Sequence, residues 1–274
     1  MHRLLAFLVF IPLLLAPGCL CETTGVNRGD VNLVGLDEEW AFGEQLAQQI
    51  VLDAPVLDDL EVQAYVDRLG QRIAAETELR ERPWRFHVLA SPEVNAFNIP
   101  GGHVFVHAGL LAAAGSTAEV AGVIAHEVAH GVARHGTERM TKAYGLNVIV
   151  NLLMGQDAGM IEQIAAQIAG SGALAKFSRD DEREADRLGL GYLLDAGYAP
   201  SGMASMFETM LALRSRRPNA VERFFSTHPL TEERIAAVRE AAAQVSEDEL
   251  VLHDEDFRRV RARVEAYAPA EGSR

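Results

Sequence analysis

Cysteine, positive charge and long hydrophobic runs are all scarce in this 274-residue chain. Its only cysteines are Cys19 and Cys21, so the main part of the chain must be held together by its core rather than by disulfides. Lys and Arg number 25 against 39 Asp and Glu. The net charge of −14 argues against a nucleic-acid-binding surface and against broad adhesion to anionic lipid. The apolar run at residues 4–16 is too short to cross a bilayer as a helix.

Residues 1–18 have the features of a secretion signal, with a weakly positive start, the apolar run and small residues near the end. The residues just before Cys19 resemble a bacterial lipobox, in which Cys19 would carry lipid and become the mature N-terminus. Ala16 and Pro17 depart from the usual lipobox residues, so ordinary signal cleavage that yields a soluble periplasmic protein is the alternative. Leu20, rather than Asp, follows Cys19, which in a diderm bacterium implies outer-membrane sorting.

The hydrophobic content of 49% is enough for one sizeable core, so one domain with appendages is the expected organisation. We expect a lipidated N-terminus and tether at residues 19–36, a folded domain at 37–245, and a C-terminal helix and tail at 246–274. Apolar residues recur mostly at helical spacing, which predicts a mostly helical α+β fold. Helices are expected at about residues 37–54, 57–78, 116–136, 178–196, 201–213, 231–244 and 254–267.

One predicted helix carries the spacing H-E-x-x-H at residues 126–130, within a strongly apolar stretch. Ser116 is the expected N-cap, and Glu119 would be the returning half of a capping box. Glycines weaken the far end of the helix, which we expect to stop near residues 135–136.

His126 and His130 lie one turn apart on the same face of this helix, where two imidazoles can bind one zinc ion per chain. Glu127 follows the first histidine, so its carboxylate can reach a water on the metal without binding the metal itself. Zinc lowers the pKa of that water, and Glu127 would take the proton as general base. The alternative is a chance match with a solvated or hydrogen-bonded histidine pair. An apolar helix favours zinc, because burying two histidines and a glutamate is costly unless they are partnered.

A zinc site with an open position for water needs a third protein ligand. Ser178 is the expected N-cap of a later helix with acidic residues in its first turn. In that helix Glu182 and Asp186 are four residues apart on one face. Glu182 could bind zinc while Asp186 accepts an N–H from a ligand histidine. Spacing alone does not choose between Glu182 and Glu184, and a solvated acidic helix start is the alternative.

Three short segments predict strands. Residues 84–90 alternate in polarity, and residues 95–99 and 103–107 flank a Pro-Gly-Gly turn. We expect a small antiparallel sheet beside the zinc helix. Because Pro100 cannot donate to a strand ladder, residues 95–98 are expected to form an exposed edge, which could accept a substrate backbone as an added strand.

Three motifs, taken in order, resemble the HtpX/BepA/LoiP and CAAX-prenyl-protease family of zinc metalloendopeptidases. They are the stretch from residues 95–97 to 109–111, the H-E-x-x-H at 126–130, and the acidic segment at 182–186. The resemblance covers roughly residues 37–245, which it implies are a zinc metallopeptidase domain. It also implies that Glu182 of an E-x-x-x-D pattern, rather than Glu184, is the third zinc ligand. Asp186 is then the Asp of that pattern, placed to accept the N–H of a ligand histidine.

Two further residues enter the site through this resemblance. In the family the edge strand lines the cleft and the Asn of an Asn-Ala-Phe-like motif faces the substrate, which implies that Asn95 donates a hydrogen bond to the substrate or oxyanion. A Thr-His-Pro-Leu loop recurs where its histidine can approach the zinc. His228 is therefore implied either to hydrogen-bond the oxyanion or to bind zinc as a latch that displaces the catalytic water. The alternatives are a turn-forming Asn95 and a surface-loop His228.

The segment 144–175 has no assigned chemistry. Residues 144–154 are strongly apolar but too short to span a membrane, and residues 155–175 are rich in Gly and Ala. Core packing is the favoured interpretation, and a mobile lid over the cleft or a lipid-facing patch is the alternative.

The sequence therefore predicts an exported, lipid-anchored zinc endopeptidase at the periplasmic face of the outer membrane. The resemblance implies unfolded or misassembled envelope proteins as substrates, and the outer-membrane assembly machinery as a candidate partner. One rival hypothesis is a latched or non-proteolytic zinc-dependent chaperone or assembly factor. Another is a protease specific for one processing event.

Overall fold

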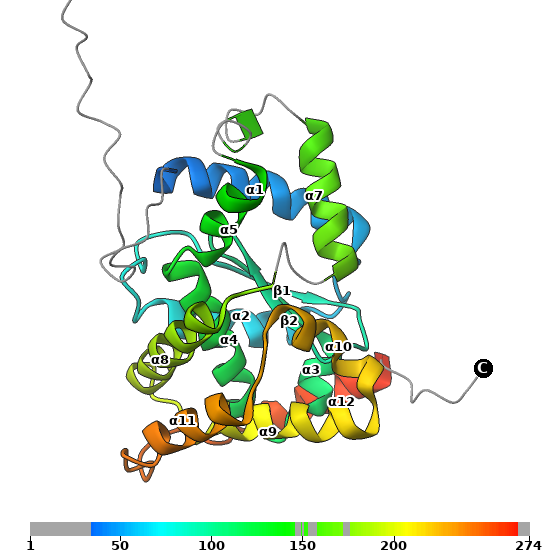
Figure 1. Ribbon diagram of the computed structural model, residues 1–274. Coiled ribbons are helices and arrows are strands. Elements are labelled where there is room, and N and C mark those ends of the chain that lie inside the picture. Colours follow the sequence, from blue (N-terminus) through cyan, green and yellow to red (C-terminus); the bar gives the residue numbers. More distant parts are fainter. Residues whose placement is uncertain (1–33, 146–148, 150, 153–157, 172–175, 268–274) are drawn as a thin grey trace, which may run out of the picture.

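The computed structural model describes residues 34–145, 149, 151–152, 158–171 and 176–267. The predicted signal peptide, Cys19 and most of the tether lie outside the described residues. Helices surround one small sheet, which confirms the predicted α+β, mostly helical class (Figure 1). The helices are α1 (Leu36–Asp53), α2 (Leu60–Ala74), α3 (Ala108–Ala113), α4 (Thr117–Val132), α5 (His135–Tyr144), α7 (Ala158–Ser171), α8 (Arg179–Asp195), α9 (Ser201–Arg216), α10 (Pro218–Thr227), α11 (Glu232–Ala242) and α12 (Phe257–Tyr267).

The sheet has three strands, β1 (Arg85–Leu89), β2 (Ala96–Ile99) and β3 (His103–His107), in the order β1-β3-β2. β2 and β3 form an antiparallel hairpin, whereas β1 pairs with β3 in parallel. The sheet is therefore mixed, and the prediction of an antiparallel sheet is wrong for one of its two pairings. The cause is the strand order, in which β3 lies between β1 and β2. β1 therefore pairs with β3 and not with β2, the next strand in sequence.

The pleat of the sheet sends alternate side chains into two separate cores. Val104 and Val106 of β3 join the larger core, which contains α2, α4, α8 and α9. Phe105 lies between them in sequence and joins the smaller core, together with Phe97 of β2 and residues of α1 and α7. Figure 1 shows α1 and α7 on one side of the sheet and α2 and α4 on the other.

The edge position of β2 is as predicted, but its exposure is not. β2 ends the strand order, yet all four of its side chains are buried. The reason is that α4 packs along this strand, so the edge faces the interior of the protein rather than solvent.

α4 is buried along its whole length, and α8 and α9 approach its backbone closely at glycines. A Cβ atom at Gly122 would lie 2.7 Å from Cα of Met203 in α9. A Cβ atom at Gly189 of α8 would lie 3.1 Å from the backbone of Ala125. Glycine at these crossings lets the backbones meet, which brings side chains of α8 into the same space as those of α4.

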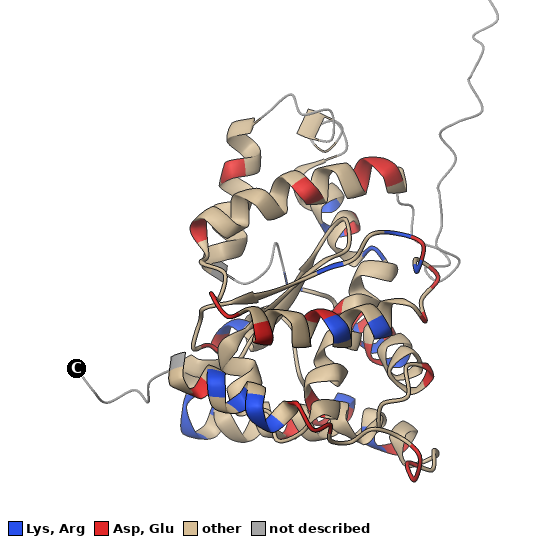
Figure 2. Cartoon of the chain, turned by 180° about the vertical axis from the view of Figure 1, so that it is seen from behind, with Lys and Arg blue, Asp and Glu red and all other residues tan. Residues whose placement is uncertain are grey.

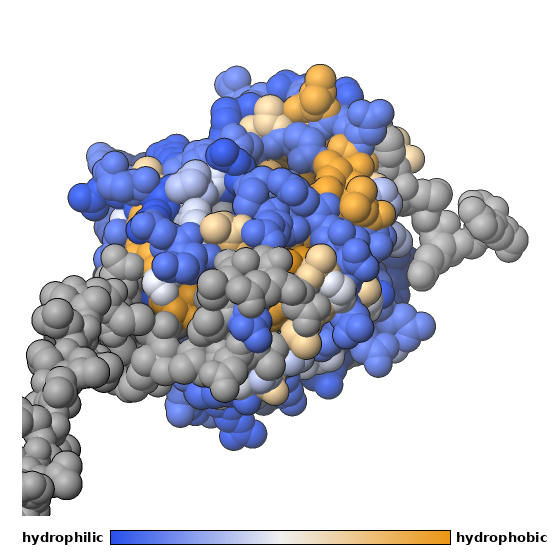
Figure 3. All heavy atoms as spheres, turned by 90° about the horizontal axis from the view of Figure 1, so that it is seen from above, coloured by the Kyte–Doolittle hydropathy of each residue, from blue (hydrophilic) through white to orange (hydrophobic). Residues whose placement is uncertain are grey.

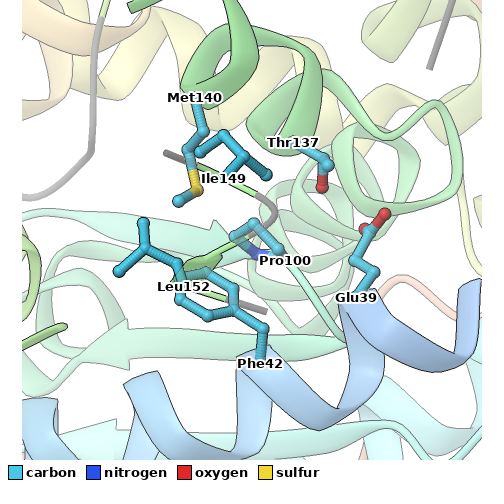
Figure 4. A pocket seen from close by; sticks show the side chains of 7 residues that line it. All are labelled: Glu39, Phe42, Pro100, Thr137, Met140, Ile149 and Leu152. Atoms are coloured by element: carbon cyan, nitrogen blue, oxygen red, sulfur yellow. The ribbon is translucent and has the colours of Figure 1, made fainter. Parts of the chain in front are cut away.

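The apolar segment after α5 packs as core where it is described. Ile149 and Leu152 are buried in the smaller core, as are the inward-facing side chains of α7. Figure 4 shows both residues directed, with Met140 of α5 and Phe42 of α1, at a small pocket beside Pro100. For the described residues, these contacts favour core packing over a lid, and the remainder of this segment lies outside the description.

Charged side chains of the two signs gather on different helices. Arginines gather on α12 and acidic residues lie along α1 (Figure 2). Over α1 and α7 the surface is mainly hydrophilic, with hydrophobic side chains in small separate groups (Figure 3). Within the described ranges, no helix combines the length and the hydropathy that a membrane span requires.

Candidate metal centre

Both helices that carry predicted metal ligands begin at their predicted caps. In α4, Ser116 Oγ accepts the Glu119 N–H at 3.1 Å. The expected capping box is not formed there, because the Glu119 carboxylate reaches past the cap to the Gly115 N–H at 2.7 Å. In α8, Ser178 and Asp181 form a complete capping box. These caps fix the start of each first turn and therefore which residues face the neighbouring helix.

The far end of α4 differs from the prediction. The helix ends at Val132, about one turn before the expected residues 135–136. The cause is Arg134, which adopts a left-handed conformation with φ 60° and ψ 28°. α5 then starts at His135, so a residue expected at the end of the zinc helix begins the next helix instead.

Four buried side chains from separate segments meet at one point. They are His126 and His130 of α4, Glu182 of α8, and His228 directly after α10, and each is 0% exposed. One ligand atom from each lies within 4.8 Å of the others. The Nε2 atoms of His126 and His130 are 3.1 Å apart, and His228 Nδ1 lies 3.0 Å from Glu182 Oε1. The structure thus brings together all the predicted ligands and the predicted loop histidine, and leaves Glu184 outside the group.

The chemistry of this donor set fits a zinc ion. Three imidazoles and one carboxylate are ligand types that zinc takes in tetrahedral sites. Two Nε2 atoms that face each other at 3.1 Å can share at most one proton, so a cation would satisfy both nitrogens in a site without water access. Burial holds the pKa of His130 well below its usual range, which favours the neutral form that binds metals. Burial opposes ionisation of Glu182, but the charge of His228 and a hydrogen bond from His130 hold its pKa well below the usual range.

Glu127 lies between the cluster and the edge of the sheet. Its Oε2 accepts the Asn98 N–H at 3.0 Å, and its Oε1 lies 3.6 Å from His228 Nε2 without a hydrogen bond. Because Asn95 O accepts the His107 N–H, the N–H of Asn98 points to the other side of β2, away from β3. Burial raises the pKa of the Glu127 carboxyl despite the opposing charges of His228 and His126. A raised pKa suits a group that both accepts and returns a proton.

Asp186 lies behind the cluster in the predicted position. Its Oδ1 is 3.1 Å from Nδ1 of His126, on the opposite side of the ring from Glu182. Asp186 also accepts two hydrogen bonds from Arg234 of α11, both 2.7 Å long. Burial opposes ionisation of Asp186, but the Arg234 hydrogen bonds hold its pKa below the usual range.

Arg234 joins three parts of the centre and was missed by the sequence analysis. Besides Asp186 it contacts Glu182, and it donates to Pro229 O at 3.0 Å in the loop that carries His228. Its side chain is only 3% exposed. The sequence did place Arg234 one helical turn before the apolar Val238, which puts both on one face of the predicted helix.

Asn95 is not joined to the cluster by any contact among the described residues. Its side chain is buried, and neither of its amide atoms has a hydrogen-bond partner within the described part of the chain. Alternation along β2 sends Asn95 to the side of Phe97, whereas Asn98 lies on the side of Ala96 and α4. The role of Asn95 stays a prediction, and Asn98 is the asparagine of this strand that touches Glu127.

Comparison with known proteins agrees with this geometry. Residues 61–242 match Peptidase family M48. The chain belongs to peptidase family M48. This confirms the resemblance drawn from the motifs, and at the level of the family it confirms the prediction of a metallopeptidase.

Curated relatives of this M48 chain come from bacteria and mitochondria. It is 29% identical over 250 residues to the beta-barrel assembly-enhancing protease of Escherichia coli, covering 87% of this chain and 50% of the relative. It is 32% identical over 217 residues to the mitochondrial metalloendopeptidase OMA1 of Schizosaccharomyces pombe, covering 78% and 64%. The Arabidopsis thaliana protein of the same name is 35% identical over 200 residues, covering 73% and 40%. The chain spans about half the length of the assembly-enhancing protease that it matches.

Proposed function

We propose that this protein is a zinc-dependent endopeptidase of the cell envelope that cleaves unfolded or misassembled proteins. One observation carries the proposal, namely that a buried group of three histidines and a glutamate has a second buried glutamate, Glu127, beside it. Family membership supports the reaction class, since M48 is a peptidase family.

The chemistry divides between His126, His130 and Glu182, which would hold the zinc, and Glu127, which moves the proton. When bound, zinc supplies a Lewis acid that polarises the substrate carbonyl and acidifies a water molecule. Glu127 Oε1 has no hydrogen-bond partner among the described residues, so it is the oxygen free to take the proton of the attacking water. The same carboxyl returns the proton to the leaving amine. His228 Nε2, which also has no hydrogen-bond partner among those residues, is the candidate donor to the oxyanion, with Asn95 as the second candidate.

The edge of β2 that faces away from β3, which α4 covers in this structure, is the proposed place for the substrate backbone. Asn98 turns its N–H toward this edge, where Glu127 now accepts it. A peptide added as a strand would compete for that N–H and would bring its carbonyl next to the catalytic carboxylate. A segment that adds as a strand must be extended. Because the site is buried, the protein must also open to admit it. Both conditions favour unfolded chains over folded ones as substrates.

A second candidate function is a latched or non-proteolytic chaperone or assembly factor, and one observation favours it. His228 Nδ1 lies 3.4 Å from His126 Nε2, inside the donor group rather than above it. If His228 binds the metal in the resting state, it occupies the position that the catalytic water needs. The peptidase would then be active only after the His228 loop moves.

The proposed location is the periplasmic face of the outer membrane, through lipid on Cys19, with a soluble periplasmic protein as the alternative. The name of the Escherichia coli relative concerns beta-barrel assembly. We therefore propose the outer-membrane assembly machinery as a partner, and the misassembled proteins that it handles as substrates.

The test is cleavage of casein, an unfolded protein, by purified zinc-loaded protein and by its Glu127→Gln and His228→Ala variants. We expect chelator-sensitive cleavage that Glu127→Gln abolishes. Cleavage by His228→Ala but not by the unaltered protein would identify the latched state. Absence of cleavage by both zinc-loaded proteins would contradict the peptidase function and favour the chaperone.

A further inference from the structure

The imidazole of His130 is held from behind by a second histidine. His135, the first residue of α5, is buried, and its Nδ1 lies 2.8 Å from Nδ1 of His130. The other nitrogen of His135, Nε2, lies 3.4 Å from Oε2 of Glu184 in α8. The ring of Phe177 stacks on His130 at 4.1 Å between centroids and lies 6.3 Å from the ring of His135. Both imidazoles are therefore packed as well as hydrogen-bonded.

The position of His135 depends on the left-handed residue that ends α4. Arg134 turns the chain there, and the turn directs His135 back toward the helix that carries His130. A left-handed arginine is unfavourable by itself and persists only where its surroundings fix it. Here the buried Glu39 of α1 accepts the Nε–H of Arg134 at 2.7 Å. The backbone turn at Arg134 therefore fixes the contact between the two histidines.

The proton positions follow from one condition, namely that His130 offers an unprotonated Nε2 to a metal. A neutral imidazole carries one N–H, so His130 must carry it on Nδ1. Nδ1 of His135, at 2.8 Å, must then accept that proton. A neutral His135 consequently carries its own proton on Nε2, directed at the Glu184 carboxylate. Every donor along this line meets an acceptor, and the line ends on a charged group.

We propose that His135 and Glu184 form a positioning relay that fixes the ring and the tautomer of His130 for zinc binding. The proposal rests on the proposed function, because it requires His130 to be a zinc ligand. It is the counterpart of the contact between Asp186 and His126, with one imidazole inserted between ligand and carboxylate. Glu184 thus acts behind the metal rather than on it.

The test is the zinc dissociation constant, measured by competition with a chelator of known affinity. Loss of an outer partner of a ligating histidine weakens metal binding by roughly 10–100-fold, and we expect this range for His135→Leu and for Glu184→Ala. Asp180→Ala is the matched control, because Asp180 lies on the same helix, has a side chain that is 91% exposed and pairs with Arg183. We expect zinc binding by this control to equal that of the unaltered protein.

A double variant separates a relay from two independent structural effects. If Glu184 acts through His135, adding Glu184→Ala to His135→Leu weakens zinc binding by less than about 2-fold more. Losses that multiply, or a Glu184→Ala variant that binds zinc like the unaltered protein, would overturn the relay. Nitrogen-15 NMR of labelled histidines gives an independent readout on the unaltered zinc-loaded protein. We expect His135 to carry its proton on Nε2, and a proton on Nδ1 would refute the proposal. Failure of the unaltered protein to bind zinc would instead contradict the proposed function itself.

Discussion

Replacing Arg234 with methionine should destabilise the metal-free protein far more than any surface arginine replacement. Arg234 is the cation that hydrogen-bonds Asp186 and contacts Glu182 in a site where both acids are buried. Methionine keeps much of the side-chain volume but removes the charge and all five guanidinium donors. Two carboxylates would then be left in the interior without this compensating cation.

The magnitude follows from the burial of this group. Removal of one partner from a buried ion pair costs about 3–5 kcal/mol, because the remaining charge is uncompensated. For a domain of this size, that loss corresponds to a melting temperature lower by roughly 6–20 °C. We expect zinc to reduce the difference, because a cation bound to Glu182 would compensate one of the two acids.

Thermal unfolding of chelator-treated protein, followed by circular dichroism, measures this effect. Arg239→Met is the matched control, because Arg239 lies on the same helix and pairs with Glu208, but its side chain is 63% exposed. A surface pair of this kind contributes about 0–1 kcal/mol. Equal melting temperatures for the two variants would refute the view that Arg234 is the central cation of the site.

Three further predictions concern acid stability, packing and the N-terminus. Burial lowers the pKa of His107 from its usual 6.5 to about 4, so the unfolded chain takes up a proton below pH 6.5 that the native state refuses until about pH 4. The stability that His107 contributes should therefore be complete above pH 6.5 and be lost at about 1.4 kcal/mol per pH unit between those values. Denaturant titrations should accordingly show a shallower decline in His107→Phe. Gly122→Ala should lower the free energy of unfolding by about 1–3 kcal/mol, because the new methyl group overpacks against Met203. Gly191→Ala should raise it by about 1 kcal/mol, because nothing lies within 4 Å of the new Cβ. Chemical unfolding of the two variants should therefore show changes of opposite sign. Mass spectrometry should find lipid on the exported protein and none on Cys19→Ser, and lipid on that variant would exclude the lipobox.

Local spacing predicted the central part of the site because helices convert sequence distance directly into position. His126 and His130 meet since residues four apart share a helix face, and Glu182 and Asp186 are paired by the same rule. The caps of these helices were predictable for a similar reason, since a cap depends on a side chain within three residues of the backbone it binds. The choice of Glu182 as the ligand that joins the two histidines came from the family resemblance, because spacing alone left Glu184 as an equal alternative.

Features that depend on distant parts of the chain were not predictable in this way. Alternating polarity identified the first strand and the Pro-Gly-Gly turn the other two, but the direction of β1 depends on which strand lies beside it. The end of α4 depends on Arg134, whose left-handed conformation is held by Glu39, 95 residues earlier in the sequence. The exposure predicted for β2 failed because α4 covers an edge that the sequence of the strand alone could not show to be covered. Asn98 rather than Asn95 meets Glu127 for a related reason, since the register of the hairpin decides which N–H points away from β3.

The central claim is that one zinc ion is held between α4 and α8, and anomalous X-ray diffraction at the zinc absorption edge tests it most directly. For crystals of the zinc-loaded protein, we predict one strong peak per chain within bonding distance of His126, His130 and Glu182. Crystals of Glu182→Gln should show a much weaker peak at the same place. A full-strength peak elsewhere, or no peak from protein loaded with zinc, would contradict the metallopeptidase account.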